Sequence, residues 1–311
     1  KTGTAGWYNT AAFHEKAKAK GLYAETINGD AFSDEIKNET IEKIKAEMGK
    51  VDLVIYSLAS PRRTDPETGV TYKSTLKPVG QAYTTKTYDT DKDKVHEVSL
   101  EPANDEEILN TIKVMGGEDW ERWMDFLREA DVLAEGCKTT AYTYIGKELT
   151  WPIYGQATIG KAKEDLDRAA AAIIGKNSDL LVQANVSSLK ALVTQASSAI
   201  PVMPLYISLI YKVMKEEGTH EGCIEQIHGL FTQCLFGNTP TLDEANRYRM
   251  DGKETNDATQ AKIKALWDQV TQENFHDLSD YKGYNHEFLK LFGFDISSVD
   301  YDSEVDPMVN W

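Results

Sequence analysis

A tyrosine and a lysine nine positions apart, Tyr154 and Lys163, have side chains that could carry out acid–base chemistry together. A phenol has an ordinary pKa of about 10, so it donates a proton readily near neutral pH only when a nearby cation lowers that pKa. Nine steps along one continuous helix would place the two side chains on opposite faces. They can therefore meet only if Tyr154 precedes the helix that carries Lys163.

The residues between the two side chains allow that arrangement. Gly155 permits a turn, and Thr158 is a suitable N-cap for a helix predicted over 158–174, which puts Lys163 in its second turn. The apolar stripe of this helix consists of Ile159, Ala162, Leu166, Ala170 and Ile173. A structural tyrosine and a solvated helix lysine are the alternative interpretation, because the spacing alone is not distinctive.

The segments around this helix alternate between helical and extended patterns. The first part predicts helices over 11–20 and 33–48 and strands over 22–27 and 52–59. The run DLVIYSLA at 52–59 is almost continuously apolar, as in a strand covered on both faces of a parallel sheet. Further strands are predicted over 139–145 and 180–186, and further helices over 105–114, 120–130, 205–215, 221–235, 258–270 and 286–291.

The fold class predicted from this alternation is α/β, with a Rossmann-type, mainly parallel sheet flanked by helices. Residues 61–102 alternate Thr, Tyr and Val with charges around a turn at 89–94, which predicts a β-hairpin insertion covering an opening. We expect a dinucleotide-binding core at 1–60 and 134–200, a hairpin and helical insertion at 61–133, and a helical substrate-pocket region at 201–311. The fingerprint GxGxxG is absent, so the first strands and the phosphate-binding glycines are expected to lie outside these residues. An α/β domain that binds no dinucleotide is the alternative.

Composition excludes several classes of partner. The formal charge of -16 argues against binding to nucleic acid, and no stretch is long and apolar enough to predict a membrane span. The cysteines, Cys137, Cys223 and Cys234, are widely spaced and occur in no metal-binding pattern, so we expect buried packing for them and no metal site. We also expect a monomer or a weak dimer.

Eight strings of residues, in order along the whole chain, carry a family resemblance. The sequence resembles the single-chain trans-2-enoyl-CoA and enoyl-acyl-carrier-protein reductases, often called the FabV or TER group. The strings are GTAGWYN (3–9), NGDAFSDEIK (28–37), YSLASPRRTDPETG (56–69), KVMGGEDWERW (113–123), AYTYIG (141–146), ATIGKAK (157–163), LVTQASSAIPVMPLY (192–206) and HEGCIEQI (220–227). Two features depart from the family: its glycine-rich NADH loop is not among these residues, and RMDGKETND (249–257) lacks an expected tryptophan-containing acidic run, a difference that we assign to a surface loop.

The resemblance implies a reaction and its catalytic residues. Hydride passes from the nicotinamide of NADH to the β-carbon of a 2-enoyl thioester, and the enolate that forms is protonated at the α-carbon. Tyr154 and Lys163 match the family's catalytic tyrosine and lysine, which implies that Tyr154 stabilises the enolate and supplies a proton. Lys163 would lower the pKa of that phenol and bind the nicotinamide ribose. Tyr144 matches the substrate-binding tyrosine, with a core tyrosine as the alternative.

The resemblance also implies which residues contact the cofactor, NADH. Asp30 and Ala31 match the contacts to the adenine, and Leu58 and Ala59 match backbone contacts to the cofactor. Lys163 matches the ribose contact, and Leu192, Val193 and Thr194 match the contacts to the nicotinamide amide. Asp30 could equally be a turn or cap residue, and Leu192 to Thr194 would by themselves be taken for a helix start. The substrate would be an acyl-CoA or acyl-carrier-protein thioester in fatty acid metabolism. The compartment would be the cytoplasm for a bacterial member and the mitochondrial matrix or another organelle for a eukaryotic one.

Two further readings of the sequence remain open. Tyr211 and Lys215 have the YxxxK spacing of short-chain dehydrogenases, but they lie in an apolar helix that we expect to line the acyl pocket with Met203, Leu205 and Ile207. The alternatives in function are a carbonyl reductase with the same tyrosine–lysine chemistry and a non-catalytic subunit of a larger assembly.

Overall fold

A four-stranded parallel sheet organises the protein. The computed structural model describes residues 3–58 and 60–309. The strands lie in the order β1 (Val51–Tyr56), β6 (Leu133–Thr143), β7 (Gln183–Ser188) and β8 (Tyr248–Arg249), and each neighbouring pair is parallel. The α/β fold class with a mainly parallel sheet is therefore confirmed. The last strand comes from the C-terminal third of the chain, next to β7.

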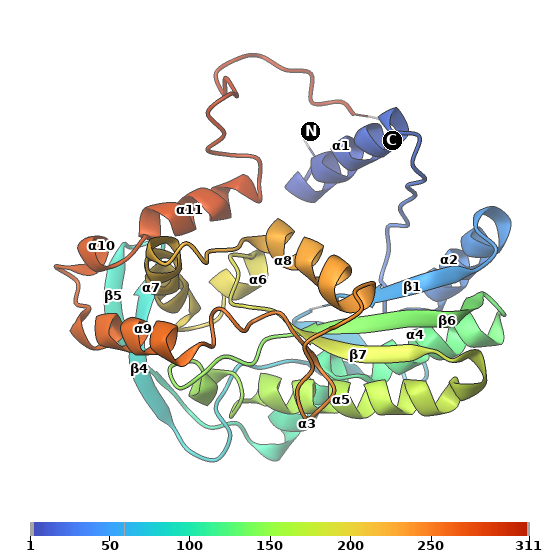
Figure 1. The fold of residues 1–311 in the computed structure, drawn as a ribbon, viewed down its shortest axis with the longest axis horizontal. Helices are drawn as coiled ribbons and strands as arrows, with labels where there is room; N and C mark the ends of the chain where they lie inside the picture. The colour runs from blue at the N-terminus through green and yellow to red at the C-terminus, as the bar shows by residue number, and fades with distance from the viewer. Residues whose placement is uncertain (1–2, 59, 310–311) are drawn as a thin grey trace.

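Helices cover both faces of this sheet (Figure 1). On one face, α4 (Glu118–Glu129) and α5 (Thr158–Lys176) pack through a cluster that includes Trp120, Leu166 and Ile173, with α3 (Asp105–Met115) beside α5. On the other face lie α8 (Cys223–Gly229) and the π-helix η3 (Leu230–Leu235). The predicted stripe of α5 is confirmed, since all five of its residues are buried.

The second large core lies around α7 (Met203–Glu216). This helix is apolar on nearly all sides and is enclosed accordingly. Its neighbours include α9 (Asp257–Gln269), α10 (Phe275–Leu278) and α11 (Tyr281–Lys290). The short helices η1 (Trp151–Ile153), η2 (Ser178–Leu180) and α6 (Gln195–Ser198) lie in the connections between strands and longer helices.

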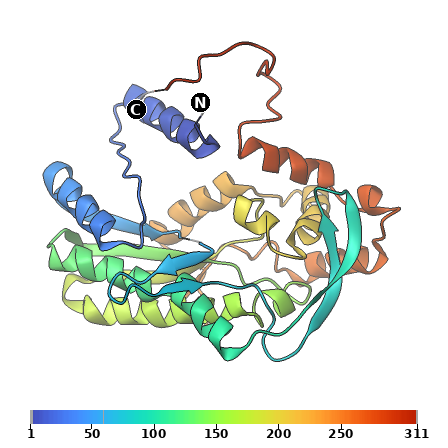
Figure 2. The ribbon, with the colours of Figure 1, turned by 180° about the vertical axis from the view of Figure 1, so that it is seen from behind.

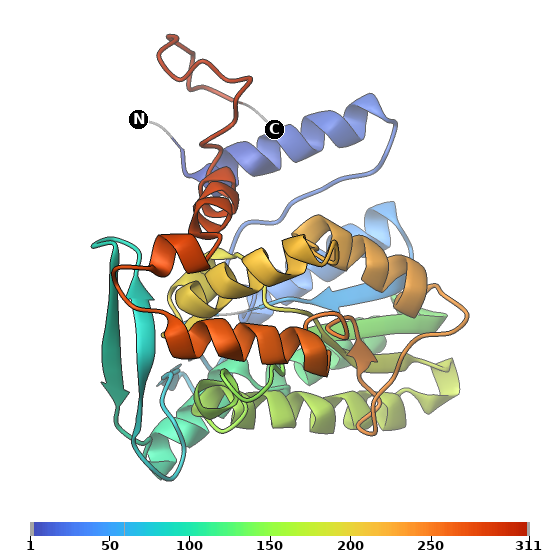
Figure 3. The same cartoon turned by 60° about the vertical axis from the view of Figure 1, so that its left-hand side comes forward.

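The predicted hairpin insertion is confirmed and is accompanied by a smaller one. Strands β4 (Tyr83–Asp89) and β5 (Lys94–Leu100) form the long hairpin, and β2 (Arg62–Thr64) pairs with β3 (Thr71–Lys73). The long hairpin stands along one side of the molecule, against α7 and the helices after it (Figures 2 and 3). Its Lys86 ammonium donates to the carbonyl oxygens of Trp267 and Val270, both at 3.0 Å, and so fixes it to the end of α9.

Two predictions near the N-terminus were wrong. Residues 22–27, all of which the structure describes, form no strand after α1 (Ala5–Ala19), because their backbone finds no neighbouring strand to pair with. Helix α2 (Asp34–Glu47) was predicted over 33–48 and begins one residue later, because Ser33 is its N-cap. The apolar centre of β1 is also only half-buried, because β1 lies at the edge of the described sheet.

Candidate active site

A cavity of about 360 Å³ opens beside the carboxyl ends of β1, β6 and β7. This is the edge of an open α/β sheet at which ligands bind. Six residues selected from the sequence line it: Leu58, Tyr144, Tyr154, Lys163, Leu192 and Thr194. Met203 also lines the cavity, whereas Leu205 and Ile207, expected in the acyl pocket, are fully buried in the core around α7.

Tyr154 lies outside the helix that carries Lys163, as the spacing requires. It follows η1 and begins a turn over residues 154–156, and α5 starts at Thr158. The predicted N-cap was wrong by one residue: Ala157 holds that position and makes no side-chain capping bond. Thr158 instead donates its hydroxyl to the carbonyl oxygen of Thr75, which ties the start of α5 to the segment before the long hairpin.

Two glycines let the Tyr154 turn pack closely on its surroundings. A Cβ on Gly160 would lie 2.5 Å from the carbonyl oxygen of Tyr154 and 2.2 Å from that of Gly155. A Cβ on Gly155 would lie 2.4 Å from the ring of Trp151. The absence of both side chains thus places the backbone of Tyr154 directly against the first turn of α5.

Gly160→Ala should therefore destabilise the protein, even though alanine is the better helix former. Overpacking against rigid backbone costs about 1 to 3 kcal/mol of the free energy of unfolding, measured by urea denaturation. Gly175→Ala is the matched control, because it lies in the same helix with open space around the added Cβ, and it should be neutral or slightly stabilising. Equal stability of the two variants would contradict this account of the turn.

Burial dominates the electrostatics of the pair. Tyr154 packs edge-on against Tyr144, with ring centroids 4.9 Å apart, and burial raises the pKa of Tyr154 to about 12. The lowered phenol pKa predicted from the sequence is therefore wrong for this state. Lys163 lines the cavity half-buried, donates to the carbonyl oxygen of Tyr142 at 3.0 Å, and has its pKa lowered by burial to about 8.

The hydroxyl of Tyr144 is engaged by protein groups. It donates to Glu254 Oε1 at 2.9 Å and lies 3.1 Å from the hydroxyl of Thr150. Burial, followed by the charge of Glu254, raises the pKa of Tyr144 well above its ordinary value. Glu254 was not predicted from the sequence, because Asp251, Gly252 and Lys253 before it are typical of an exposed loop. The assignment of 249–257 to a surface loop was wrong, since Asp251 is 1% exposed and Glu254 is 0% exposed.

The segment 192–194 contributes only in part to the cavity wall. Leu192 and Thr194 line the cavity, and Thr194 caps α6, its hydroxyl accepting from the amide of Ser197 at 3.0 Å. The helix start suggested by these residues is thus present in the structure. Val193 is 2% exposed and belongs to the core around α7.

The predicted adenine positions lie beside a second cavity, of about 370 Å³. Ala31 and Leu58 line it, and Leu58 lines the first cavity as well, together with Tyr56 and Ser57. The two cavities are therefore adjacent at the end of β1. Asp30 accepts from the amide of Phe32 at 3.0 Å, which is the turn-residue geometry given as its alternative. Ala59 lies outside the described residues.

Neither Tyr211 nor Lys215, the pair with the YxxxK spacing, lines this cavity. Both residues are on α7, where the ammonium of Lys215 lies 5.3 Å from the centroid of the Tyr211 ring and also pairs with Asp280 at 2.5 Å. Tyr211 is 1% exposed. These contacts are those of a structural pair.

Comparison with known proteins identifies the family. A family model described as the trans-2-enoyl-CoA reductase catalytic region matches residues 1–236. The chain belongs to the trans-2-enoyl-CoA reductase family. A protein of Pseudoalteromonas atlantica named enoyl-[acyl-carrier-protein] reductase [NADH] is 80% identical over 311 residues, which are all of this chain and 79% of that protein. One of the same name from Idiomarina loihiensis is 70% identical over the same shares of both chains.

Solved reductases of this family share the fold. The trans-2-enoyl-CoA reductase of Treponema denticola, in complex with NAD, has a TM-score of 0.94 and 51% identity over 98% of this chain and 76% of that one. A Clostridium trans-2-enoyl-CoA reductase in complex with NADH has a TM-score of 0.95 and 45% identity over 98% of this chain and 77% of that one. The resemblance inferred from the sequence is confirmed.

A second family model, described as the enoyl reductase FAD binding domain, matches residues 242–305. The residues of this segment do not fit a flavin dinucleotide, whose pyrophosphate needs cations or free backbone amides. The segment carries 14 Asp and Glu against seven Lys and Arg. Ion pairs with carboxylates already engage Arg247, Arg249, Lys253, Lys262, Lys264 and Lys290.

Neither a membrane-spanning helix nor a metal-binding cluster occurs in the part of the chain that the structure describes. No helix in 3–58 or 60–309 is long and apolar enough to cross a membrane. No group of three or more His, Cys, Asp or Glu side chains in that part of the chain could hold a metal ion. The three cysteines are free there, with Cys137 and Cys234 buried and Cys223 partly so.

Proposed function

We propose that this chain catalyses the NADH-dependent reduction of the 2,3 double bond of trans-2-enoyl thioesters. One observation carries the proposal beyond family membership: Tyr144, Tyr154 and Lys163 line a single cavity at the carboxyl ends of the sheet strands. A dinucleotide would extend from Leu192 and Thr194, at the nicotinamide end, past Leu58 to Ala31 at the adenine end. The adjacent cavities that share Leu58 support that path.

The roles of the two central residues follow from their surroundings. Tyr154 would donate its hydroxyl hydrogen bond to the thioester oxygen, where negative charge develops, within a site that burial shields from water. Lys163 would leave the carbonyl of Tyr142 and bind the ribose hydroxyls, bringing its charge toward the phenol. NADH, when bound, supplies the hydride that is added to the β-carbon.

A direct assay tests the function. NADH oxidation should be observed with crotonyl-CoA and with crotonyl-acyl-carrier-protein, measured side by side to identify the preferred thioester. Acetoacetyl-CoA serves as the ketone substrate of the competing carbonyl reductase and should be inert. Turnover of the ketone without turnover of either crotonyl thioester would overturn the proposal, and no turnover at all would favour the non-catalytic subunit.

The affinity for NADH should depend on pH through Lys163. Its pKa of about 8 means that the ammonium loses its proton as the pH rises through that value, and a neutral amine binds the ribose hydroxyls less strongly. The NADH dissociation constant, followed by fluorescence titration, should therefore rise above pH 8. In Lys163→Arg the charge persists, so the same titration should show no such rise. A wild-type affinity that stays constant to pH 10 would contradict this role.

We also propose that the chain is a monomer or a weak dimer. Its net charge of -16 makes copies of the chain repel each other, which supports this state. Sedimentation velocity at low and high salt tests it.

A further inference from the structure

A buried carboxylate lies behind the cavity, outside the residues so far given a role. Glu254 follows β8 and is 0% exposed. Its Oε1 accepts from the phenols of Tyr144 at 2.9 Å and Tyr206 at 2.8 Å, and its Oε2 accepts from the amide of Ala191 at 2.5 Å. One side chain thus connects the end of β6, the segment after β7, and α7.

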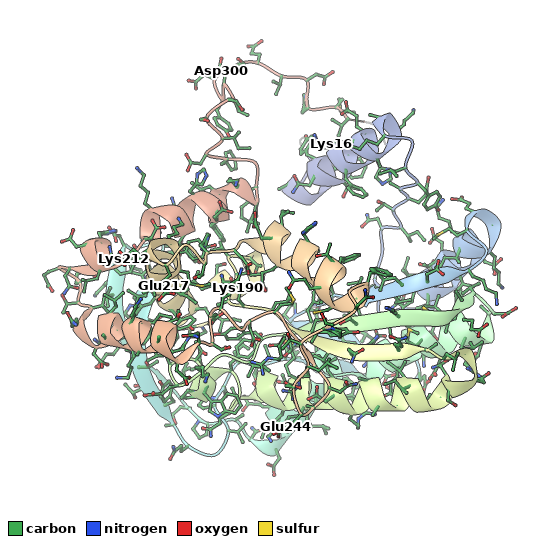
Figure 4. All side chains as sticks on the ribbon, in the orientation of Figure 1. Lys16, Lys190, Lys212, Glu217, Glu244 and Asp300 are labelled. Atoms are coloured by element: carbon green, nitrogen blue, oxygen red, sulfur yellow. The ribbon has the colours of Figure 1, made fainter. Side chains whose placement is uncertain are left out.

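The charge of this group is balanced by that of Lys190 through the backbone of one residue, Ala191. The amide of Ala191 binds Glu254, and the carbonyl oxygen of the same residue accepts from the ammonium of Lys190 at 2.7 Å. Lys190 is itself 3% exposed, and Figure 4 shows it in the interior, whereas Lys16 and Asp300 lie at the periphery. Both Lys190 and Ala191 line the cavity, so the groups that balance the charge of Glu254 lie in the cavity wall.

The hydrogens in this network have defined directions. The phenol oxygen of Tyr206 accepts from the amide of Gln260 at 3.0 Å, so its single proton is free to go to Glu254. Burial raises the pKa of Glu254, and the charge of Lys190 and the hydrogen bonds that the carboxylate accepts oppose this rise. Tyr144 has one proton, which it donates in a hydrogen bond to the ionised Glu254, while the Thr150 hydroxyl can donate to the same phenol oxygen. In this arrangement Tyr144 has no proton left for a ligand in the cavity.

We propose that Glu254 is a positioning residue for the reduction, acting through Tyr144. Its carboxylate fixes the ring of Tyr144 edge-on to Tyr154 and uses the Tyr144 proton, which leaves Tyr154 as the phenol that donates to the thioester oxygen. The inference rests on the proposed function, because its effect is on crotonyl thioester turnover. It adds to that function a residue 100 positions from Tyr154 in sequence.

A glutamine at position 254 cannot reproduce the three hydrogen bonds that the carboxylate of Glu254 accepts. If its amide oxygen keeps the bond to Ala191, its NH₂ group faces the two phenols and reverses both of their hydrogen bonds; if it turns, two donors meet at Ala191. Tyr206→Phe is the matched control, because it removes the other phenol from the same oxygen, and Tyr206 does not line the cavity.

The test is a double-mutant cycle on kcat with crotonyl-CoA and NADH. Glu254→Gln and Tyr144→Phe should each lower kcat about tenfold, and the double variant should be no worse than the poorer single one, since both changes break one interaction. Tyr206→Phe should lower Tm by a comparable amount while leaving kcat within about twofold of wild type. If Glu254→Gln fails to fold, Glu254→Asp, which shortens the side chain but keeps its charge, replaces it in the same cycle.

The possible failures are distinct. Effects of Glu254→Gln and Tyr144→Phe that multiply, or a kcat that is unchanged in Glu254→Gln, would overturn the positioning role while the wild-type enzyme still reduced crotonyl-CoA. A fall in kcat for Tyr206→Phe equal to that for Glu254→Gln would also overturn it, since the effect would then follow from loss of packing alone. Absence of wild-type turnover would overturn the proposed function and this inference together.

Discussion

Tyr154→Phe should lower kcat for crotonyl thioester reduction by about 10² to 10⁴, which corresponds to about 3 to 5 kcal/mol of transition-state stabilisation. The substitution keeps the ring that packs against Tyr144 and removes only the hydroxyl. In the proposed mechanism that hydroxyl binds the thioester oxygen as charge develops there, so its loss should affect the transition state more than the bound substrate. The NADH dissociation constant should change less than about threefold, and stopped-flow measurement of hydride transfer separates the two effects.

Tyr211→Phe is the control for this prediction. Tyr211 is also buried and has a lysine on the same helical face, so it tests whether any buried tyrosine–lysine pair would serve. Crotonyl thioester reduction should remain nearly unchanged in this variant. Full activity of Tyr154→Phe together with loss of activity in Tyr211→Phe would transfer the catalytic role to α7.

The sequence predicted those parts of the fold that depend on local pattern. The stripe of α5, the long hairpin and the presence of strands at β1, β6 and β7 follow from apolar periodicity and turn residues, which act over a few positions. The segment 22–27 has the composition of a strand, but a strand forms only where a neighbouring strand completes its hydrogen bonds. The edge position of β1 is likewise a property of the assembled sheet.

The candidate site was predictable only where residues near in sequence act together. Tyr154 and Lys163 are separated by one turn, and the requirement that they converge could be worked out from helix geometry. Glu254 reaches Tyr144 from 110 positions away, through the short strand β8, which has only two residues and no detectable pattern. Burial raises the pKa of Tyr154, whereas a lowered pKa was predicted. The spacing of residues along the chain does not show how deeply a side chain is buried.

Lys163→Ala should differ from Tyr154→Phe by weakening both NADH binding and turnover. Hydrogen bonds from a charged group contribute about 1.5 to 3 kcal/mol, so loss of the bonds to the ribose should raise the NADH dissociation constant about 10- to 100-fold. Turnover at saturating NADH should fall as well, because the ammonium also favours the charge that develops as Tyr154 gives up its proton. Lys161→Ala is the control, since Lys161 lies on the same helix and pairs with Glu164 at the surface, and it should alter neither quantity.

The double variant Tyr154→Phe/Lys163→Ala shows whether the two residues act as one unit. In the present structure the ammonium is bonded to the carbonyl of Tyr142, so the coupling has to form when the ribose draws Lys163 away. If this coupling between Tyr154 and Lys163 forms, kcat of the double variant should fall by clearly less than the product of the two single effects. Multiplying effects would mean that Lys163 acts on the cofactor alone and that Tyr154 donates its proton without help from a cation. In that case Tyr154, whose pKa burial raises to about 12, would act as a neutral hydrogen-bond donor to the thioester oxygen.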